Sequence, residues 1–311
     1  MSRLMRNVRA ARPGLTLVEV LVSFLLLAIV GGGITRVMMK QQAFYKDASL
    51  TANAKRELRL GATMLPSELR SISSSGGDVL LMSEFGVQLR AYTGTSIVCA
   101  RTADDIWVPP TNLARHKLTT YVTRPEVGDT VFIFNENTGT GSQDDQWEKR
   151  WITAIDANAS DCAGLPFTDP ALDPPTSKKR TRYHLNAALP AEVGIGAVVR
   201  FTRPIRYRLY EESSGKWYMG LEEYTSGSWS APSPIAGPFR SYASGDAAQS
   251  GMQFRFFDSL GVRINDMTKR QDVARIDVYL RTLSGQSAIR ERKGADLTDS
   301  VLMRVAIRNF K

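Results

Sequence analysis

An apolar segment near the N-terminus constrains this chain more than any other feature. It runs from Leu15 to Ile34, follows a leader with four arginines and no acidic residue, and contains one carboxylate, Glu19. About twenty residues at a rise of 1.5 Å cross a hydrocarbon core of roughly 30 Å. An acidic side chain inside such a segment costs roughly 2.5–3.5 kcal/mol at mid-membrane and less near an end. We therefore expect Glu19 to have a compensating partner.

The spacing around Gly14 suggests what that partner is. Cleavage after Gly14 would place a new α-amine on Leu15, and Glu19 would become the fifth residue, about one helical turn away. Each subunit would then carry a cation and an anion at nearly the same membrane depth. Neighbouring subunits could pair amine with carboxylate.

This pattern, with Thr16 next and an apolar helix beyond, resembles the class III signal of type IV pilins and type II secretion pseudopilins. The resemblance implies that a membrane prepilin peptidase cleaves between Gly14 and Leu15, N-methylates Leu15, and leaves Glu19 to act in filament assembly. It also implies other pilin or pseudopilin subunits, an inner-membrane assembly platform and the lipid bilayer as partners. The family usually has Phe where this chain has Leu15, a departure that leaves the expected cleavage intact.

Three other interpretations of the segment compete with this one. An ordinary signal peptide has an apolar core of about 7–15 residues followed by an A-x-A-like site, and residues 28–31 match such a site poorly. A signal anchor explains the length and the basic flank but leaves Glu19 and the Arg-Pro-Gly sequence unexplained. A buried helix of a soluble protein is disfavoured, because 18 or more nearly uninterrupted apolar residues indicate a membrane span.

The charge distribution argues against nucleic acid as a partner. The chain has 40 Lys and Arg against 31 Asp and Glu, a net charge of +9. Removing residues 1–14 takes away four arginines and no acid, which leaves 36 − 31 = +5. So small a charge on nearly 300 residues is a weak signal for nucleic-acid binding. The densest basic patch, residues 178–182, is expected to be a solvated loop.

The residues after the apolar segment continue a helical pattern. Residues 35–66 contain no proline before Pro66 and combine an apolar stripe with lysines, arginines and Glu57. We expect one spine helix of about fifty residues, interrupted by a bend or local melting at residues 31–33, where three glycines each cost about 1 kcal/mol relative to Ala. Pro66 and the serine-rich run after it are expected to end this helix.

The rest of the chain shows strand patterns. Residues 78–162 read as a small β-rich module, 163–196 as a loop and linker, and 197–311 as an antiparallel sheet, with a proline-marked linker at 232–238. The expected fold is α+β, a long N-terminal helix packed on a C-terminal antiparallel sheet with an inserted β module. This order loosely resembles minor pilins of the PilW type and pseudopilins of the GspJ type.

Chemistry-bearing motifs are scarce. The two histidines, His116 and His184, lack metal-ligand spacing, two cysteines cannot build a Cys₄ zinc site, and no P-loop or nucleophile-elbow motif occurs. The acidic patches at 104–105, 135–137 and 144–145 could offer oxygen ligands to Ca²⁺, but they lack EF-hand order and are expected to be solvated loops. We expect no enzyme activity, no cofactor and no bound metal.

The two cysteines, Cys99 and Cys162, are candidates for a disulfide. The head is expected in an oxidising compartment, and closing a loop of about 64 residues stabilises a fold by about 4 kcal/mol in the chain-entropy model. Two separate buried thiols are the alternative, because the sequence does not show that the Cα atoms approach within about 7 Å.

The expected function is that of a minor prepilin-like subunit that assembles into or primes a type IV pilus-like filament. Before assembly it would sit in a bacterial inner membrane, with its leader in the cytoplasm and its head outside. One alternative is a minor pseudopilin at the tip of a type II secretion pseudopilus. A second is a filament-borne adhesin or DNA-uptake module, since aromatic rings can stack on sugars or bases. Packing in the core is the competing role for most of the tryptophans, which are Trp107, Trp147, Trp151, Trp217 and Trp229.

Overall fold

The computed structural model describes residues 14, 16–113, 117–137, 145–157, 159, 162, 167, 169, 172, 180–243, 245–286 and 296–307. The chain divides into two compact units. The first comprises residues 1–52 and 285–297, and the second comprises residues 53–284 and 298–311. Residues 1–13 of the expected leader and Leu15 lie outside the described residues, as do His116 and Asp144.

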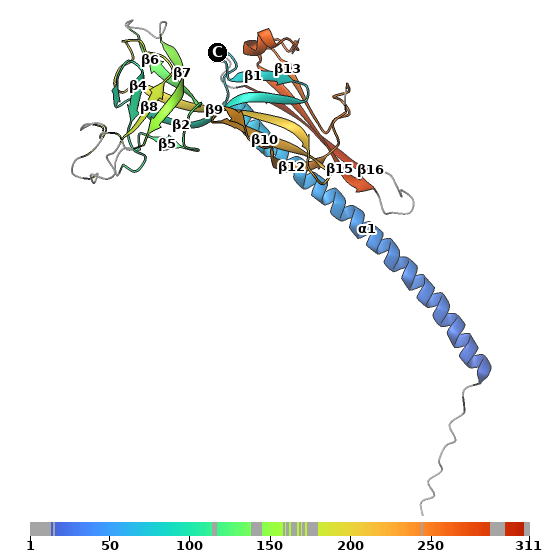
Figure 1. Cartoon of the computed structure of the whole chain (residues 1–311). Coiled ribbons are helices and arrows are strands. Elements are labelled where there is room, and N and C mark those ends of the chain that lie inside the picture. The colour runs from blue at the N-terminus through green and yellow to red at the C-terminus, as the bar shows by residue number, and fades with distance from the viewer. Residues whose placement is uncertain are drawn as a thin grey trace, which may run out of the picture. The chain divides into compact units, whose positions relative to one another are not determined.

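The long helix expected from the sequence is present as α1 (Leu17–Ser71), drawn in blue in Figure 1. Thr16 caps its first turn, because the backbone N–H of Glu19 donates to Thr16 Oγ1 over 3.3 Å. The helix is long and apolar enough to span a membrane. It is unbroken through residues 31–33, so the expected local melting there is absent from the structure.

The helix also continues past Pro66, where the sequence predicted its end. A proline inside a helix costs about 3 kcal/mol because it removes one backbone hydrogen bond. Leu65 and Leu69 are completely buried on either side of it, and Ile72 is buried just beyond the helix. Each such side chain contributes about 1.5–3 kcal/mol on burial, which offsets the proline.

The C-terminal part of α1 packs on an antiparallel sheet within the second unit. Its buried leucines share one core with strand residues such as Met219 and Leu280. Gly61 lies where helix and sheet approach most tightly, since a Cβ there would lie 2.6 Å from Leu280 Cδ1. A larger residue at this position would push the helix off the sheet.

The sheet has sixteen strands among the described residues, and their pairings are antiparallel. In chain order these are β1 (Val79–Ser83), β2 (Gly86–Ile97), β3 (Ala100–Arg101), β4 (Asp105–Val108), β5 (Thr120–Tyr121), β6 (Thr130–Asn135), β7 (Gln146–Asp156), β8 (Thr181–Leu185), β9 (Val198–Glu211), β10 (Trp217–Thr225), β11 (Ser228–Trp229), β12 (Ser233–Phe239), β13 (Met252–Phe257), β14 (Arg263–Ile264), β15 (Arg275–Gln286) and β16 (Asp296–Ala306). A 3₁₀ helix, η2 (Met267–Asp272), follows β14.

Two long strands, β2 and β9, connect the two parts of the sheet. Their register runs from Gly86 opposite Arg208 to Ile97 opposite Val198. One half of this ribbon belongs to the core under α1, and the other half joins β4, β6, β7 and β8 around a second core. The α+β expectation is confirmed, but the sheet is larger than expected, because the strands expected in a separate module join the C-terminal ones.

Gly94 allows the ribbon to change register. The pairing of β2 with β9 shifts between Tyr92 and Gly94. A Cβ on Gly94 would lie 2.5 Å from Tyr121 Cδ1 and 2.7 Å from the Thr120 carbonyl oxygen. Only glycine lets β5 approach β2 this closely.

Two segments expected to be irregular form strands. Residues 181–185, inside the predicted loop, form β8, which pairs with β4 and β7 and buries Tyr183 and Leu185. Residues 233–239, predicted as a proline-marked linker, form β12. Its register against β10 shifts twice, and such irregularities accommodate residues that cannot donate to the ladder.

Candidate functional site

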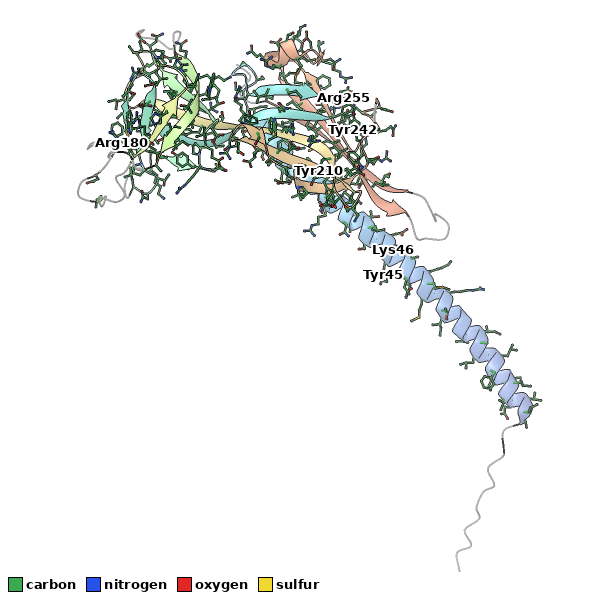
Figure 2. The ribbon with its side chains drawn as sticks, in the orientation of Figure 1. Tyr45, Lys46, Arg180, Tyr210, Tyr242 and Arg255 are labelled. Atoms are coloured by element: carbon green, nitrogen blue, oxygen red, sulfur yellow. A yellow bond between two sulfur atoms is a disulfide. The ribbon has the colours of Figure 1, made fainter. Side chains whose placement is uncertain are left out.

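The N-terminal half of α1 presents an unusually apolar surface. In Figure 2 the side chains of Tyr45 and Lys46 project from this helix. The exposed large apolar residues between the helix start and Tyr45 are Leu17, Val18, Val20, Leu21, Val22, Phe24, Leu25, Leu26, Leu27, Ile29, Val30, Ile34, Val37, Met38, Met39, Phe44 and Tyr45. A contiguous apolar surface of this size marks a membrane or protein contact.

The residues of the expected processing site lie at the start of this surface. Gly14 is exposed, and a Cβ added to it would meet no atom within 4 Å. Glu19 is exposed in the first turn of α1. Its carboxylate makes no hydrogen bond or ion pair with any residue that the structure describes. Glu19 therefore remains available to a partner outside the chain.

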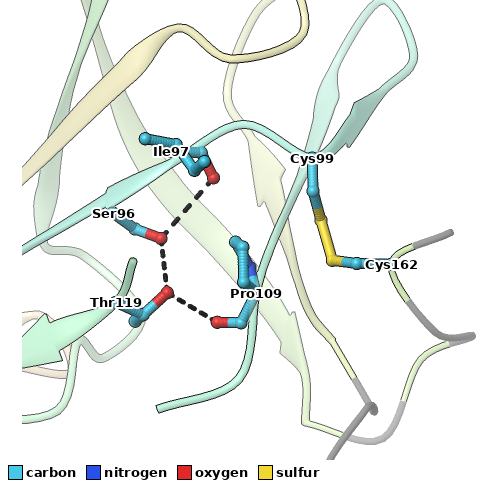
Figure 3. Close-up of a disulfide and its surroundings, with 6 residues drawn as sticks. All are labelled: Ser96, Ile97, Cys99, Pro109, Thr119 and Cys162. Carbon is cyan, nitrogen blue, oxygen red and sulfur yellow. Dashed lines mark hydrogen bonds between the residues drawn. A yellow bond between two sulfur atoms is a disulfide. The ribbon is translucent and has the colours of Figure 1, made fainter. Parts of the chain in front are cut away.

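Cys99 and Cys162 are joined by a disulfide, shown in Figure 3, with Cα atoms 5.9 Å apart. Both residues are buried and pack with Phe167 and Trp107. Beside the bridge, Ser96 Oγ and Thr119 Oγ1 lie 2.6 Å apart, and Thr119 donates to the Pro109 carbonyl. The bridge ties the residue before β3 to Cys162, 63 positions further along the chain.

His184 lies on strand β8, and its side chain is 29% exposed. Its Nδ1 is 2.7 Å from Asp105 Oδ1, and its Nε2 is 3.2 Å from Asp156 Oδ2. Arg182 Nε donates to Asp105 Oδ2 over 3.1 Å. Burial alone would raise the pKa of Asp105, but the hydrogen bonds from Arg182 and Thr102 and the nearby His184 hold that pKa below its usual value. Arg182 and His184 on β8 thus each contact Asp105 on β4 and Asp156 on β7, which links the three strands.

The acidic patches do not form a recognisable metal site. Among the described residues, no group of three His, Cys, Asp or Glu side chains is placed to hold an ion. Asp105 is engaged as above, and the side chain of Asn135 accepts a hydrogen bond from the Asn137 N–H over 3.0 Å. Asp145 is described, whereas Asp144 lies outside the described residues.

A buried arginine, Arg203, was not singled out from the sequence. Its side chain is 3% exposed, and its Nε and Nη2 donate to the two carboxylate oxygens of Asp129 over 2.9 and 3.0 Å. Nη1 donates to Glu223 and Nη2 also to the Arg124 carbonyl. Asp129 and Glu223 raise the pKa of Arg203 despite its burial, so it stays charged. The available signal was position: in the alternating strand β9, Arg203 falls on the same face as the buried Phe201 and Ile205.

The five tryptophans divide between packing and exposure. Trp107 lies beneath the guanidinium groups of Arg180 and Arg182, and Trp217 stacks on Tyr242. Trp147 and Trp151 are 40% and 53% exposed. The guanidinium group of Arg200 lies over the ring of Trp147, and that of Arg206 lies over the ring of Trp229.

Trp147 lines a cavity of about 600 Å³ in the second unit. One wall is the β7–β6–β9 sheet face, which contributes Lys149 and Arg200, and the other is the loop after α1, which contributes Asp78. No sequence motif indicated this cavity, because its walls are more than fifty residues apart along the chain.

No family model, curated protein or solved structure matches the chain.

Proposed function

We propose that this chain is a membrane-inserted, pilin-like structural subunit that assembles into or primes a helical filament through α1. The observation that carries the proposal is the combination of an exposed apolar helix with an unpartnered acid, Glu19, in its first turn. A bilayer covers the apolar side chains, since burial of each contributes about 1.5–3 kcal/mol. Lipid does not compensate the carboxylate, whereas a neighbouring subunit with a free α-amine does.

The two ends of α1 differ in the burial of their apolar side chains, and this difference supports the same proposal. Residues up to Tyr45 expose their apolar side chains, whereas Leu58, Leu65 and Leu69 bury theirs in the core of the second unit. A single helix thus serves as the assembly element at one end and as part of a folded head at the other. A cleaved signal peptide would not need to be continuous with that core helix.

The resemblance of residues 12–20 to the prepilin signal supplies the processing step. Gly14 would enter the peptidase site without a side chain, and Leu15 would become the methylated N-terminus. Partners under this proposal are the peptidase, other subunits of the filament and an inner-membrane assembly platform. A minor pseudopilin of a secretion pseudopilus is the alternative, because it uses the same helix and signal.

Mass spectrometry of the protein purified from its native membrane tests the proposal. We expect an N-terminus at Leu15, heavier by one methyl group, and full-length precursor when Gly14→Leu is expressed. Gly194→Leu, which also replaces an exposed non-helical glycine whose added Cβ would meet no atom within 4 Å, serves as a control that leaves cleavage intact. A mature terminus near residues 31–33 would contradict the proposal and indicate an ordinary signal peptide.

Recovery of the wild-type protein from sheared surface filaments distinguishes the two versions of the proposal. A pilus subunit appears in the sheared fraction. A pseudopilus subunit stays with the cell envelope, and its deletion blocks release of secreted proteins.

A further inference from the structure

The cavity beside Trp147 combines features of a ligand site. On its sheet wall, Lys149 on β7, Phe132 on β6 and Arg200 on β9 lie directly opposite one another across the strands. In the next row Trp147 faces Phe134, with their rings in an edge-on contact at 5.3 Å. Cations and aromatic rings therefore alternate on one face of a three-stranded sheet.

The opposite wall offers hydroxyl groups and one carboxylate. It is formed by Ser73, Ser75, Gly76 and Asp78, from the loop between α1 and β1. Asp78 is buried and its Oδ2 accepts a hydrogen bond from the Ser73 N–H over 2.8 Å, which fixes the carboxylate at the cavity edge. The sheet wall is thus held by strand pairing, and the loop wall is held in part by the hydrogen bond between Ser73 and Asp78.

The cavity has an excess of positive charge. Neither Lys149 nor Arg200 makes an ion pair with any residue that the structure describes. Partial burial lowers the pKa of Lys149, the charges of Arg90 and Arg270 lower it further, and Asp78 alone opposes them. Lys149, Arg200, Arg90 and Arg270 thus place four positive charges in or near the cavity, against the single carboxylate of Asp78. This excess favours an anionic ligand.

The aromatic groups narrow the class of that anion. Trp147 is 40% exposed, and the Arg200 guanidinium lies 5.6 Å from the centroid of its ring. An exposed indole packs well on the apolar C–H face of a sugar ring. The serine hydroxyls and the Asp78 carboxylate can pair with sugar hydroxyls, and Lys149 and Arg200 can pair with a carboxylate on the same ring.

We propose that this cavity binds an acidic saccharide, a sugar unit whose ring lies on Trp147 and whose carboxylate meets Lys149 and Arg200. The cavity volume of about 600 Å³ holds a few sugar units at most. A single nucleic-acid strand is less well matched, because its phosphates would pass the Asp78 carboxylate and because the lining cations form one row, without the continued track that such a strand requires. The inference goes beyond the proposed assembly role and does not depend on it.

Calorimetric titration of the full chain in detergent micelles tests the inference. The probes are trigalacturonate, the neutral galactotriose and a ten-residue thymidine oligonucleotide. We expect trigalacturonate to bind at least tenfold more tightly than either other probe, with affinity that falls as salt is added.

Substitutions locate the site. Trp147→Ala and Lys149→Gln should each weaken trigalacturonate binding about tenfold or more. Trp229→Ala removes another tryptophan that lies under an arginine, Arg206, and should leave binding unchanged. Lys216→Gln, just before β10, is the charge control and should also have no effect.

Three results would overturn the inference. One is galactotriose binding equal to that of trigalacturonate. Another is tighter binding of the oligonucleotide, which would indicate a nucleic-acid surface. The third is loss of binding in the control variants as well as in Trp147→Ala. Far-UV circular dichroism of each variant establishes that it is folded, and Trp147→Phe, which keeps an aromatic ring, should retain most of the affinity if Trp147→Ala fails to fold.

Discussion

Removing the buried guanidinium of Arg203 should destabilise the head strongly. Arg203→Met would keep most of the side-chain volume. It would leave the Asp129 carboxylate, which is 1% exposed, with the Glu126 N–H as its one hydrogen-bond donor among the described residues. Breaking a buried ion pair from one side costs about 3–5 kcal/mol. Four hydrogen bonds from Arg203 are lost as well, so we expect the upper part of that range.

The pH dependence of this variant gives a second signature. Burial raises the pKa of Asp129, and the bonds from Arg203 oppose that rise. Without Arg203 the native-state pKa rises further above the unfolded value, so the native state binds a proton more readily than the unfolded state. Stability is then greatest below about pH 4 and is lost as pH rises through the native pKa. The penalty of Arg203→Met should therefore be smaller at pH 5 than at pH 8.

Urea unfolding followed by tryptophan fluorescence measures both effects. The matched control is the double variant Arg203→Met with Asp129→Leu, which removes both charges and should recover most of the lost stability. Two results would refute the view that the charges of Arg203 and Asp129 stabilise each other. One is a loss of less than about 1 kcal/mol in the free energy of unfolding for Arg203→Met, and the other is no regained stability in the double variant.

Three further predictions concern the head. Non-reducing peptide mapping should recover Cys99 and Cys162 in one disulfide-linked peptide, and reduction should lower the urea midpoint; two free thiols would contradict this. The lowered pKa of Asp105 implies stability that is present above about pH 4 and lost as pH falls below it, so Asp105→Asn should flatten the acid limb of a stability-against-pH profile, and an unchanged limb would argue against its ion pairs. Gly61→Val should cost about 1–3 kcal/mol by overpacking against Leu280, measured by thermal unfolding; a neutral result would show that helix and sheet separate easily.

The sequence was sufficient for the helix and for the α+β class, because both depend on local patterns. The apolar run, the Thr16 cap and the absence of early proline all favour a helix. Its end was placed too early, since the rule for Pro66 is local, whereas the burial of Leu69 depends on strands far along the chain. The strand β8 was missed for a similar reason: the surrounding prolines and lysines suggested a loop, and only its partners β4 and β7 make it a strand.

The site could be predicted only in part. Gly14 and Glu19 stand in a short contiguous pattern, so the resemblance of that pattern to the prepilin signal marked them as candidates. The Trp147 cavity brings together residues from β7, β9 and the loop after α1. Such a juxtaposition depends on the register of a large sheet, and no motif in a single segment encodes it. The partner of Arg203 was hidden for the same reason, since Asp129 lies 74 residues away along the chain.

The most direct test of the proposed assembly role is the fate of Glu19→Val. The measured quantity is the ratio of subunit in sheared filaments to subunit in the membrane, compared with that of the wild-type protein. Ser23→Val is the matched control, since it makes a similar replacement one helical turn further along α1. If Glu19 pairs with the α-amine of a neighbouring subunit, Glu19→Val should be cleaved and inserted but excluded from filaments, Glu19→Asp should be partly incorporated, and Ser23→Val should behave as wild type. Wild-type incorporation of Glu19→Val would contradict the pairing mechanism.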